Sequence, residues 1–205
     1  MLSPSRQHAH NMSREILREL SYDSDLLLNF VTQREPLLNT DQQAIYREVL
    51  RRCSKREGGE IFIDAPGGTR KTFLINVLLA KIRGEKNIAL AVATSGIAAI
   101  LITGGRTAHS MLQIPIDLIH NEIPVCNIKK ESTKAYVLQE AKVLFWDEIS
   151  MMHKHGLETV NRTLQDLRGN KDLMGGLIVV LAGDFRQTLP VIPRGTMADC
   201  CKMQQ

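Results

Sequence analysis

The chain has 205 residues, of which 43% are hydrophobic, and 26 Lys and Arg against 22 Asp and Glu give a formal net charge of +4. This length and composition predict one sizeable core with a small appended segment, and the charge excess is too modest to argue for a nucleic-acid groove. The longest apolar run, residues 88–102, is shorter than a membrane span and contains polar residues, and the first twenty residues lack the apolar stretch of a signal peptide. We therefore expect no membrane partner.

Helices are predicted before the first strand. Residues 12–32 carry apolar residues at helical spacing, and Ser13 is placed to cap the first turn. An amphipathic helix is predicted at 41–53, where Thr40 or Asp41 can act as the cap.

From residue 60 onward, strands and helices alternate. Apolar strands are predicted at 60–64, 87–94, 142–148 and 176–184. Helices are predicted at 71–82, 96–101, 132–141 and 155–167, with a turn and a short helical turn at 104–112 and a loop at 113–130. This order predicts an α/β fold with a mostly parallel sheet and helices on both of its faces.

Three polar segments directly follow predicted strands. They are the Gly-rich loop after residue 64, the Asp147–Glu148 pair and the segment from Asp184 to Gln187. Because ligands bind at the carboxyl ends of parallel strands, we expect these segments to meet at one edge of the sheet.

The Gly-rich loop is a near match to a phosphate-binding loop. Residues 65–72 read A-P-G-G-T-R-K-T against G-x-x-x-x-G-K-[ST]. The predicted ATP-binding residues of this loop are Pro66, Gly67, Gly68, Thr69, Arg70, Lys71 and Thr72. Lys71 would reach the β and γ phosphates, and the Thr72 hydroxyl would ligate Mg²⁺. Taken alone, the segment is equally compatible with an ordinary Gly-rich turn.

Two residues of the loop depart from the pattern, because Ala65 and Arg70 occupy the positions of the framing glycines. A residue other than glycine forced to positive φ costs on the order of 1 kcal/mol or more. We hypothesise that Arg70 leaves ATP binding intact and slows hydrolysis.

The remaining polar residues of this edge fit phosphoryl transfer. Asp147 would hold Mg²⁺, Glu148 would polarise the attacking water, and Gln187 would sense the γ-phosphate. Asp184 and Arg186 would hold the last loop in place. A solvated acidic pair and an ordinary polar loop are the simpler alternatives for these segments.

In this order, the segments resemble the motifs of the Pif (petite integration frequency) family of superfamily-one B DNA helicases, and the variety carried by Helitron transposons looks most similar. The matching segments are EPLLNTDQQ, DAPGGTRKTF, ATSGIAAILITGGRTAHSMLQIP, WDEISMMHKHGLETVNRTLQDLRG and LAGDFRQTLPVIPRG. The resemblance implies a RecA-like P-loop NTPase fold and ATP-driven translocation on single-stranded DNA in the 5′ to 3′ sense. It also implies roles in recombination, repair, telomere maintenance or transposition, a nuclear location, and a monomer.

The resemblance also assigns residues. It implies that Gln42 recognises adenine, and it favours DNA backbone contacts by Thr94, Ser95, Arg106, His109 and Ser110. A structural histidine that closes the GGRTAHS turn remains an alternative for His109.

We expect a helical segment at 1–38 and the first motor domain at 39–205, without the second motor domain and its arginine finger. A catalytically impaired, transposon-derived fragment that binds nucleotide or DNA is therefore an alternative to a working helicase motor. A P-loop NTPase of another kind is a third, which GGRTAHS and GDFRQTLP argue against.

The four cysteines show no CxxC pair and no regular spacing, so a zinc site or a disulfide framework is not indicated. Reduced thiols are the simpler interpretation of Cys53, Cys126, Cys200 and Cys201.

Overall fold

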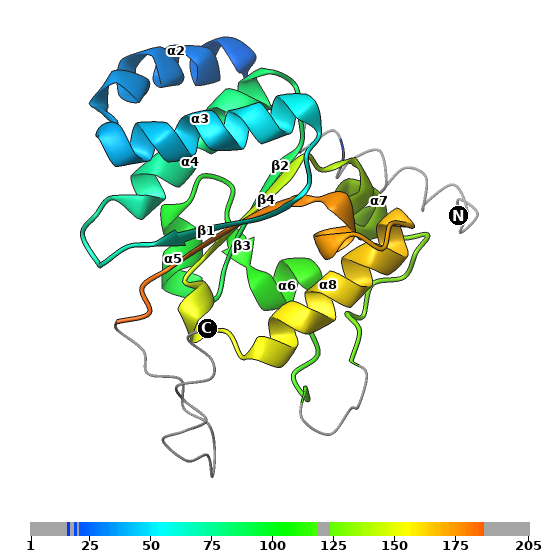
Figure 1. Ribbon diagram of the computed structural model, residues 1–205. Helices are drawn as coiled ribbons and strands as arrows, with labels where there is room; N and C mark the ends of the chain where they lie inside the picture. Colours follow the sequence, from blue (N-terminus) through cyan, green and yellow to red (C-terminus); the bar gives the residue numbers. More distant parts are fainter. Residues whose placement is uncertain (1–15, 17–18, 20, 119–123, 187–205) are drawn as a thin grey trace.

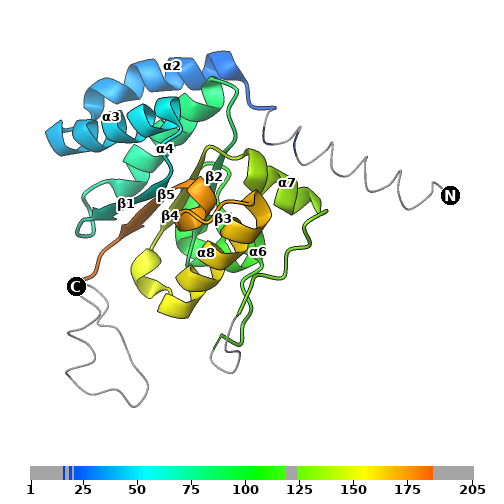
Figure 2. The same cartoon turned by 45° about the vertical axis from the view of Figure 1, so that its right-hand side comes forward.

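The computed structural model describes residues 16, 19, 21–118 and 124–186 (Figure 1). Within these residues lies a five-stranded sheet with the order β1-β5-β4-β2-β3, in which every neighbouring pair is parallel (Figure 2). The strands are β1 (Gly59–Asp64), β2 (Ala89–Ala93), β3 (Arg106–Thr107), β4 (Val143–Asp147) and β5 (Ile178–Gly183). The predicted α/β fold with a parallel sheet is confirmed.

Helices cover both faces of the sheet. One core contains side chains from α3 (Thr40–Lys55), α4 (Lys71–Gly84) and α5 (Gly96–Leu101), and α2 (Ser24–Arg34) packs on the outside of α4. The other core contains side chains from α6 (Ala108–Leu112), α7 (Thr133–Glu140) and α8 (Lys154–Arg168). Single 3₁₀ turns lie at η1 (Glu35–Leu37), η2 (Ile149–Met151) and η3 (Leu173–Gly176).

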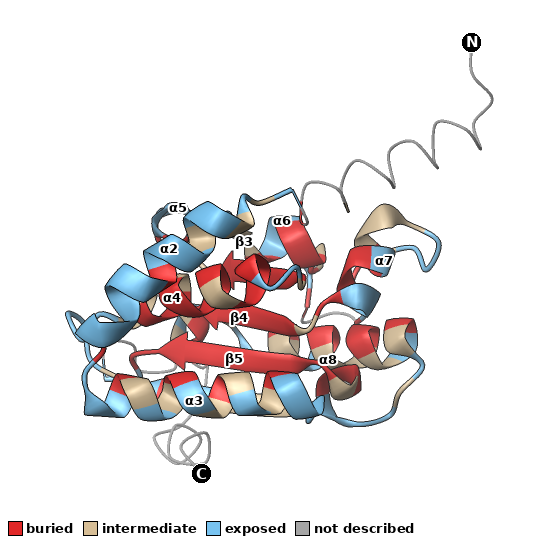
Figure 3. Cartoon of the chain, turned by 90° about the horizontal axis from the view of Figure 1, so that it is seen from above, coloured by how far each residue is buried: buried red, intermediate tan, exposed pale blue. Residues whose placement is uncertain are grey.

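The central strands are buried on both faces, which explains their continuous apolar runs (Figure 3). Along β4, Val143 and Phe145 pack into the core beneath α3 and α4, whereas Leu144 and Trp146 pack into the core beneath α6 to α8. The apolar pattern therefore located these strands, although it could not assign their faces.

The N-cap of α3 differs from the prediction. Asn39 caps this helix, because its side chain accepts a hydrogen bond from Gln42 N at 2.8 Å while Gln42 Oε1 accepts one from Asn39 N at 3.1 Å. Thr40 and Asp41 already belong to the helix, so the assignment of the cap to either of them was wrong. This reciprocal arrangement is a capping box. Ser13 lies outside the described residues.

Strand β3 was not predicted, since two residues are too short to show a strand pattern. It pairs with β2 through Val92 and Arg106.

The turn that precedes β3 is held by Arg83, which is only 3% exposed. Arg83 Nε donates to the Ala89 carbonyl at 3.0 Å, and Nη1 donates to the Thr103 carbonyl at 2.6 Å. Burial lowers the pKa of Arg83.

Strand β1 forms one edge of the sheet within the described part of the chain. Gly59 N and Ala65 N donate to carbonyls on the β5 side. Because backbone groups alternate in direction along a parallel strand, Glu60, Phe62 and Asp64 direct theirs to the outer edge. The Phe62 side chain is 49% exposed and lies against Phe185, with ring centroids 5.1 Å apart.

Cys53 and Cys126 are buried free thiols, and burial raises the pKa of Cys53 to about 11. Cys200 and Cys201 lie outside the described residues. No helix in the described ranges combines the length and the apolar character needed to cross a bilayer.

Candidate functional site

The carboxyl ends of β1, β4 and β5 bring three predicted segments together. The loop after β1 is tied to the end of β5, because Gly67 N donates to Asp184 Oδ2 at 2.9 Å. The other carboxylate oxygen of Asp184 accepts a hydrogen bond from Arg186 N at 3.1 Å. Asp184 is 3% exposed, so a buried carboxylate at the end of β5 holds the loop in position. Gln187 lies outside the described residues, and its role as a sensor stays a prediction.

Two side chains of the loop are positioned by its own carbonyls. Lys71 Nζ donates to the carbonyls of Ala65 and Pro66, the second at 3.2 Å, and Thr69 Oγ1 donates to the Pro66 carbonyl at 2.7 Å. The residues from Pro66 to Arg70 are exposed, so the loop is open to a ligand.

Helix α3 also contacts the loop. Gln42 is 8% exposed, and its Nε2 donates to the Thr69 carbonyl at 3.0 Å. No sequence pattern indicated this contact, because the two residues are far apart along the chain. Gln42 thus lies beside the loop, and its contact with adenine stays a prediction.

Thr72 and Asp147 form the predicted metal pair. The Thr72 hydroxyl donates to Asp147 Oδ2 at 3.3 Å. A hydroxyl and a carboxylate are hard oxygen donors, and Mg²⁺ commonly takes one or two such protein ligands together with nucleotide phosphates and water. The donor set therefore fits Mg²⁺. The described ranges contain no group of three or more His, Cys, Asp or Glu that could hold a metal without a nucleotide.

The acidic residues of this edge influence one another. Burial raises the pKa of Asp147. The pKa of Glu148 is raised first by burial and then by the neighbouring charges of Asp147 and Asp184, whereas Lys71 lowers it. Two raised carboxyl pKa values beside a lysine are the kind of perturbation that is found at catalytic sites.

Two of the six described residues other than glycine that have positive φ lie at the same edge. Arg70 has φ 61° and Glu148 has φ 55°, both in the left-handed region. Strained residues cluster at active sites and ligand clamps. The guanidinium of Arg70 lies 4.4 Å from the centroid of the Phe73 ring, so its side chain packs on the first turn of α4. Position 70 therefore has the positive φ that favours glycine.

Replacing Arg70 by glycine is expected to change the free energy of unfolding by less than about 0.5 kcal/mol. Relief of backbone strain contributes about 1 kcal/mol, and loss of the contact with Phe73 removes about 0.5–1 kcal/mol. Arg56, at φ 55°, has no such aromatic contact among the described residues, so Arg56→Gly should stabilise by about 1 kcal/mol. Urea denaturation of both variants provides the comparison, and equal gains would contradict a stabilising contact with Phe73.

Replacing Asp147 by asparagine is expected to stabilise the fold at neutral pH by about 0.5–2 kcal/mol and to weaken Mg²⁺ binding about tenfold or more. Since its folded pKa is raised, wild-type stability falls as pH rises from the ordinary value of 3.8 through the raised value. The gain should therefore vanish in acid. Thermal melts across pH check this, with exposed Asp166→Asn as the control. A gain that persists in acid would contradict the electrostatic cause.

The predicted DNA residues after β2 have structural partners. Thr94 Oγ1 accepts a hydrogen bond from Trp146 Nε1 at 3.0 Å, and Thr94 N donates to the Asp147 carbonyl at 3.1 Å. The Ser95 hydroxyl caps α5 by accepting from Ala98 N at 3.1 Å. Both residues lie at the carboxyl end of β2, on the same edge as the phosphate loop.

The other predicted DNA residues lie on β3 and α6. The Arg106 guanidinium pairs with Glu19 at 3.3 Å. His109 and Ser110 are exposed on α6, and the Ser110 carbonyl accepts a hydrogen bond from Lys134 Nζ at 2.8 Å. Of the five residues, only these last two combine exposure with no side-chain partner among the described residues.

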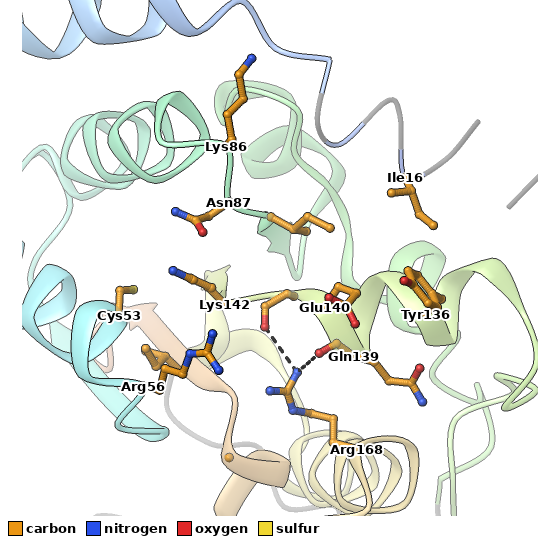
Figure 4. Close-up of a pocket in the computed structure, with 14 residues that line it drawn as sticks. Ile16, Cys53, Arg56, Lys86, Asn87, Tyr136, Gln139, Glu140, Lys142 and Arg168 are labelled. Carbon is orange, nitrogen blue, oxygen red and sulfur yellow. Dashed lines mark hydrogen bonds between the residues drawn. The ribbon is translucent and has the colours of Figure 1, made fainter. Parts of the chain in front are cut away.

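A pocket of about 500 Å³ lies elsewhere, at the amino ends of β2, β4 and β5 (Figure 4). Its lining includes Arg56, Lys86, Lys142 and Arg168. Arg168 Nη1 donates to the last carbonyls of α7, including Gln139 at 2.7 Å, so this cation caps a helix C-terminus. The pocket is therefore separate from the predicted nucleotide site.

Comparison with known proteins decides the family. The sequence pattern that defines the family described as PIF1-like helicase matches residues 37–204. The chain belongs to the PIF1-like helicase family.

The ATP-dependent DNA helicase Pif1 of Psychrobacter is 36% identical to this PIF1-like chain over 140 residues, which are 68% of the chain and 21% of that protein. The helicase PIF1 of Candida albicans is 31% identical over 159 residues, or 77% and 17% of the two chains. A Bacteroides Pif1 helicase crystallised with ADP-AlF3 and single-stranded DNA shares the fold at a TM-score of 0.64 and 29% identity, over 81% of this chain and 36% of that one.

These comparisons confirm the resemblance to the Pif helicases and the RecA-like fold class. The chain spans about a fifth of the length of these curated relatives. Most of the sequence of these two relatives has no counterpart in the matched region. The activities of the whole relatives are therefore only proposals for this PIF1-like chain.

Proposed function

We propose that the chain binds Mg²⁺-ATP at the carboxyl ends of β1, β4 and β5 and hydrolyses it as the first motor domain of an ATP-dependent DNA helicase. The observation that carries this proposal is the contact between Thr72 Oγ1, at the start of α4, and Asp147 Oδ2, at the end of β4, which are 3.3 Å apart. It places a hydroxyl and a carboxylate beside an exposed, Gly-rich loop, as a metal-bound nucleotide requires.

Each residue has a proposed role. Lys71 neutralises the β and γ phosphates, and Thr72 and Asp147 hold Mg²⁺ when it is bound with the nucleotide. The metal then supplies charge neutralisation on the phosphates. Glu148 accepts a proton from the attacking water, which its raised pKa favours. Gln187 orients that water or senses the γ-phosphate.

Gln42 is proposed to contact adenine, as the family resemblance implies. The same amide donates to the Thr69 carbonyl. A base that contacts Gln42 would therefore affect the position of Thr69 in the phosphate loop.

Single-stranded DNA is proposed to cross the adjacent part of the same edge, at Thr94, Ser95, Arg106, His109 and Ser110. Support comes from the Bacteroides Pif1 helicase crystallised with single-stranded DNA. Arg106 already pairs with Glu19, so a DNA phosphate that binds Arg106 must compete with the Glu19 carboxylate for its guanidinium group.

The wider properties are carried over from the family. We propose a first motor domain at 39–205 behind a helical segment at 1–38, translocation in the 5′ to 3′ sense by the first motor domain together with a second one, a monomer, and a nuclear location. Repair, recombination, telomere maintenance and transposition of the Helitron kind are the proposed contexts.

A second candidate function is favoured by one observation. Arg70 occupies a left-handed position directly before Lys71, where the phosphate-loop pattern has a glycine. The chain would then be a nucleotide- and DNA-binding fragment with slow turnover.

The test is a titration of Mg²⁺-ATP with and without a thymidine oligonucleotide, followed by measurement of phosphate release. Micromolar binding and DNA-stimulated release support the motor. Binding without release in the wild type, together with release by Arg70→Gly, supports the second candidate. Absence of both ATP and DNA binding overturns both.

A further inference from the structure

Trp146 is the single tryptophan of the chain and is fully buried. It directly precedes Asp147 on β4, and its indole N–H donates to Thr94 Oγ1 at 3.0 Å. A buried N–H without a partner is costly, so this hydrogen bond holds Thr94 and the end of β4 in a fixed relation.

A second contact strengthens the connection. Thr94 N donates to the carbonyl of Asp147 at 3.1 Å, continuing the ladder in which Ala93 is aligned with Asp147. Asp147 in turn accepts a hydrogen bond from Thr72, at the start of α4. Contacts of 3.3 Å or less thus run without a break from the residue after β2, through β4, to the predicted metal pair.

The orientation of the Thr94 hydroxyl follows from this geometry. A hydroxyl has one proton to donate and two lone pairs that accept. Because the indole N–H occupies a lone pair, the hydroxyl proton is available to another acceptor, such as a DNA phosphate. Hydrogen bonds in a chain polarise one another, so a phosphate that accepts this proton makes the oxygen a stronger acceptor for Trp146.

We propose that Trp146 and Thr94 are positioning residues that transmit binding of single-stranded DNA, at the carboxyl end of β2, to Asp147 and thereby to Mg²⁺-ATP. This inference rests on the proposed function, since it requires both ligands to bind. The link is a coupling free energy, so DNA and nucleotide strengthen each other's binding by the same factor.

The experiment measures this factor with the full chain. A non-hydrolysable fluorescent ATP analogue with Mg²⁺ is titrated with and without a saturating thymidine oligonucleotide. The wild type is expected to bind the analogue about fivefold or more tightly with DNA. Trp146→Phe, which lacks the N–H, is expected to bind the analogue normally without DNA and to show a factor near one.

Two further variants separate the hydrogen bond from packing. Phe145→Leu alters the neighbouring buried residue, which faces the other core, and should retain the coupling factor. Thr94→Val, which keeps the shape but removes the hydroxyl, should lose the coupling between DNA and the ATP analogue, whereas Thr94→Ser, which keeps a hydroxyl, should retain the coupling. If Trp146→Phe does not fold, as judged by circular dichroism, the comparison of Thr94→Val with Thr94→Ser tests the hydrogen bond.

The outcomes distinguish the two proposals. Binding of both ligands to the wild type with a factor near one overturns the coupling and leaves the proposed function standing. Equal loss of coupling in Trp146→Phe and Phe145→Leu, or full coupling in Thr94→Val, overturns the role of the hydrogen bond. If the wild type binds neither the ATP analogue nor the oligonucleotide when each is titrated alone, the proposed function is overturned, and this inference with it.

Discussion

Replacing Lys71 by alanine is expected to weaken binding of Mg²⁺-ATP about 100-fold. The ammonium group lies within the phosphate loop, where it donates to the carbonyls of Ala65 and Pro66. Bonds from a charged donor contribute about 1.5–3 kcal/mol each, and two bonds to phosphate oxygens correspond to about 3 kcal/mol after loss of these carbonyl contacts. Each 1.4 kcal/mol is a factor of ten in affinity.

Calorimetric titration of the wild type and Lys71→Ala provides the measurement. Lys81→Ala is the matched control, because Lys81 lies on the same helix and pairs with Glu85 at 3.0 Å, away from the loop. The control should bind ATP as the wild type does. Equal affinity of Lys71→Ala and Lys81→Ala would show that ATP is bound elsewhere.

Replacing Arg83 by alanine is expected to lower the free energy of unfolding by about 3 kcal/mol or more. The substitution removes the donors of two carbonyl groups, at Ala89 and Thr103, and the cation that lies 4.6 Å from the centroid of the Tyr22 ring. The Ala89 carbonyl, whose bond to Arg83 is buried, would be left without a partner and would retain its full desolvation cost. The turn before β3, which leads to Arg106, should loosen with this loss.

Urea denaturation followed by circular dichroism measures the effect. Arg83→Lys is expected to recover only part of the stability, because an ammonium group cannot reproduce the two directed bonds of a guanidinium. Exposed Arg56→Ala serves as the surface control and should change stability by no more than about 0.5 kcal/mol. A small effect of Arg83→Ala would mean that water replaces both bonds.

Most of the central sheet could be predicted from the sequence, because each buried strand is recognisable from its own short run of residues. Buried strands read as apolar runs, and the direction of parallel strands requires their carboxyl ends to share an edge. Lys71, Thr72 and Asp147 could therefore be assigned to one site from the order of strands and polar segments alone.

The missed features depend on contacts between distant segments. Arg83 looks like an ordinary solvent-facing residue of a helix, and only the fold shows that it is buried between β2 and the Thr103 turn. The bond from Trp146 to Thr94 and the contact of Gln42 with Thr69 have no sequence signal for the same reason. Asn39 was missed because a helix boundary is uncertain by a residue or two.

Within the described part of the chain, β1 leaves one edge of the sheet unpaired, and this edge affects how the protein behaves at high concentration. Phe62 and Asp64 direct backbone groups to this edge, where a strand of another molecule can pair with them, whereas the Glu60 carbonyl already accepts a hydrogen bond from Arg52 Nη1 at 3.3 Å. Charged side chains on such an edge oppose this association. Because burial raises the pKa of Glu60, its charge is lost at a higher pH than that of an ordinary glutamate. Mild acid should therefore weaken the protection of this edge, which light scattering would show as increased association.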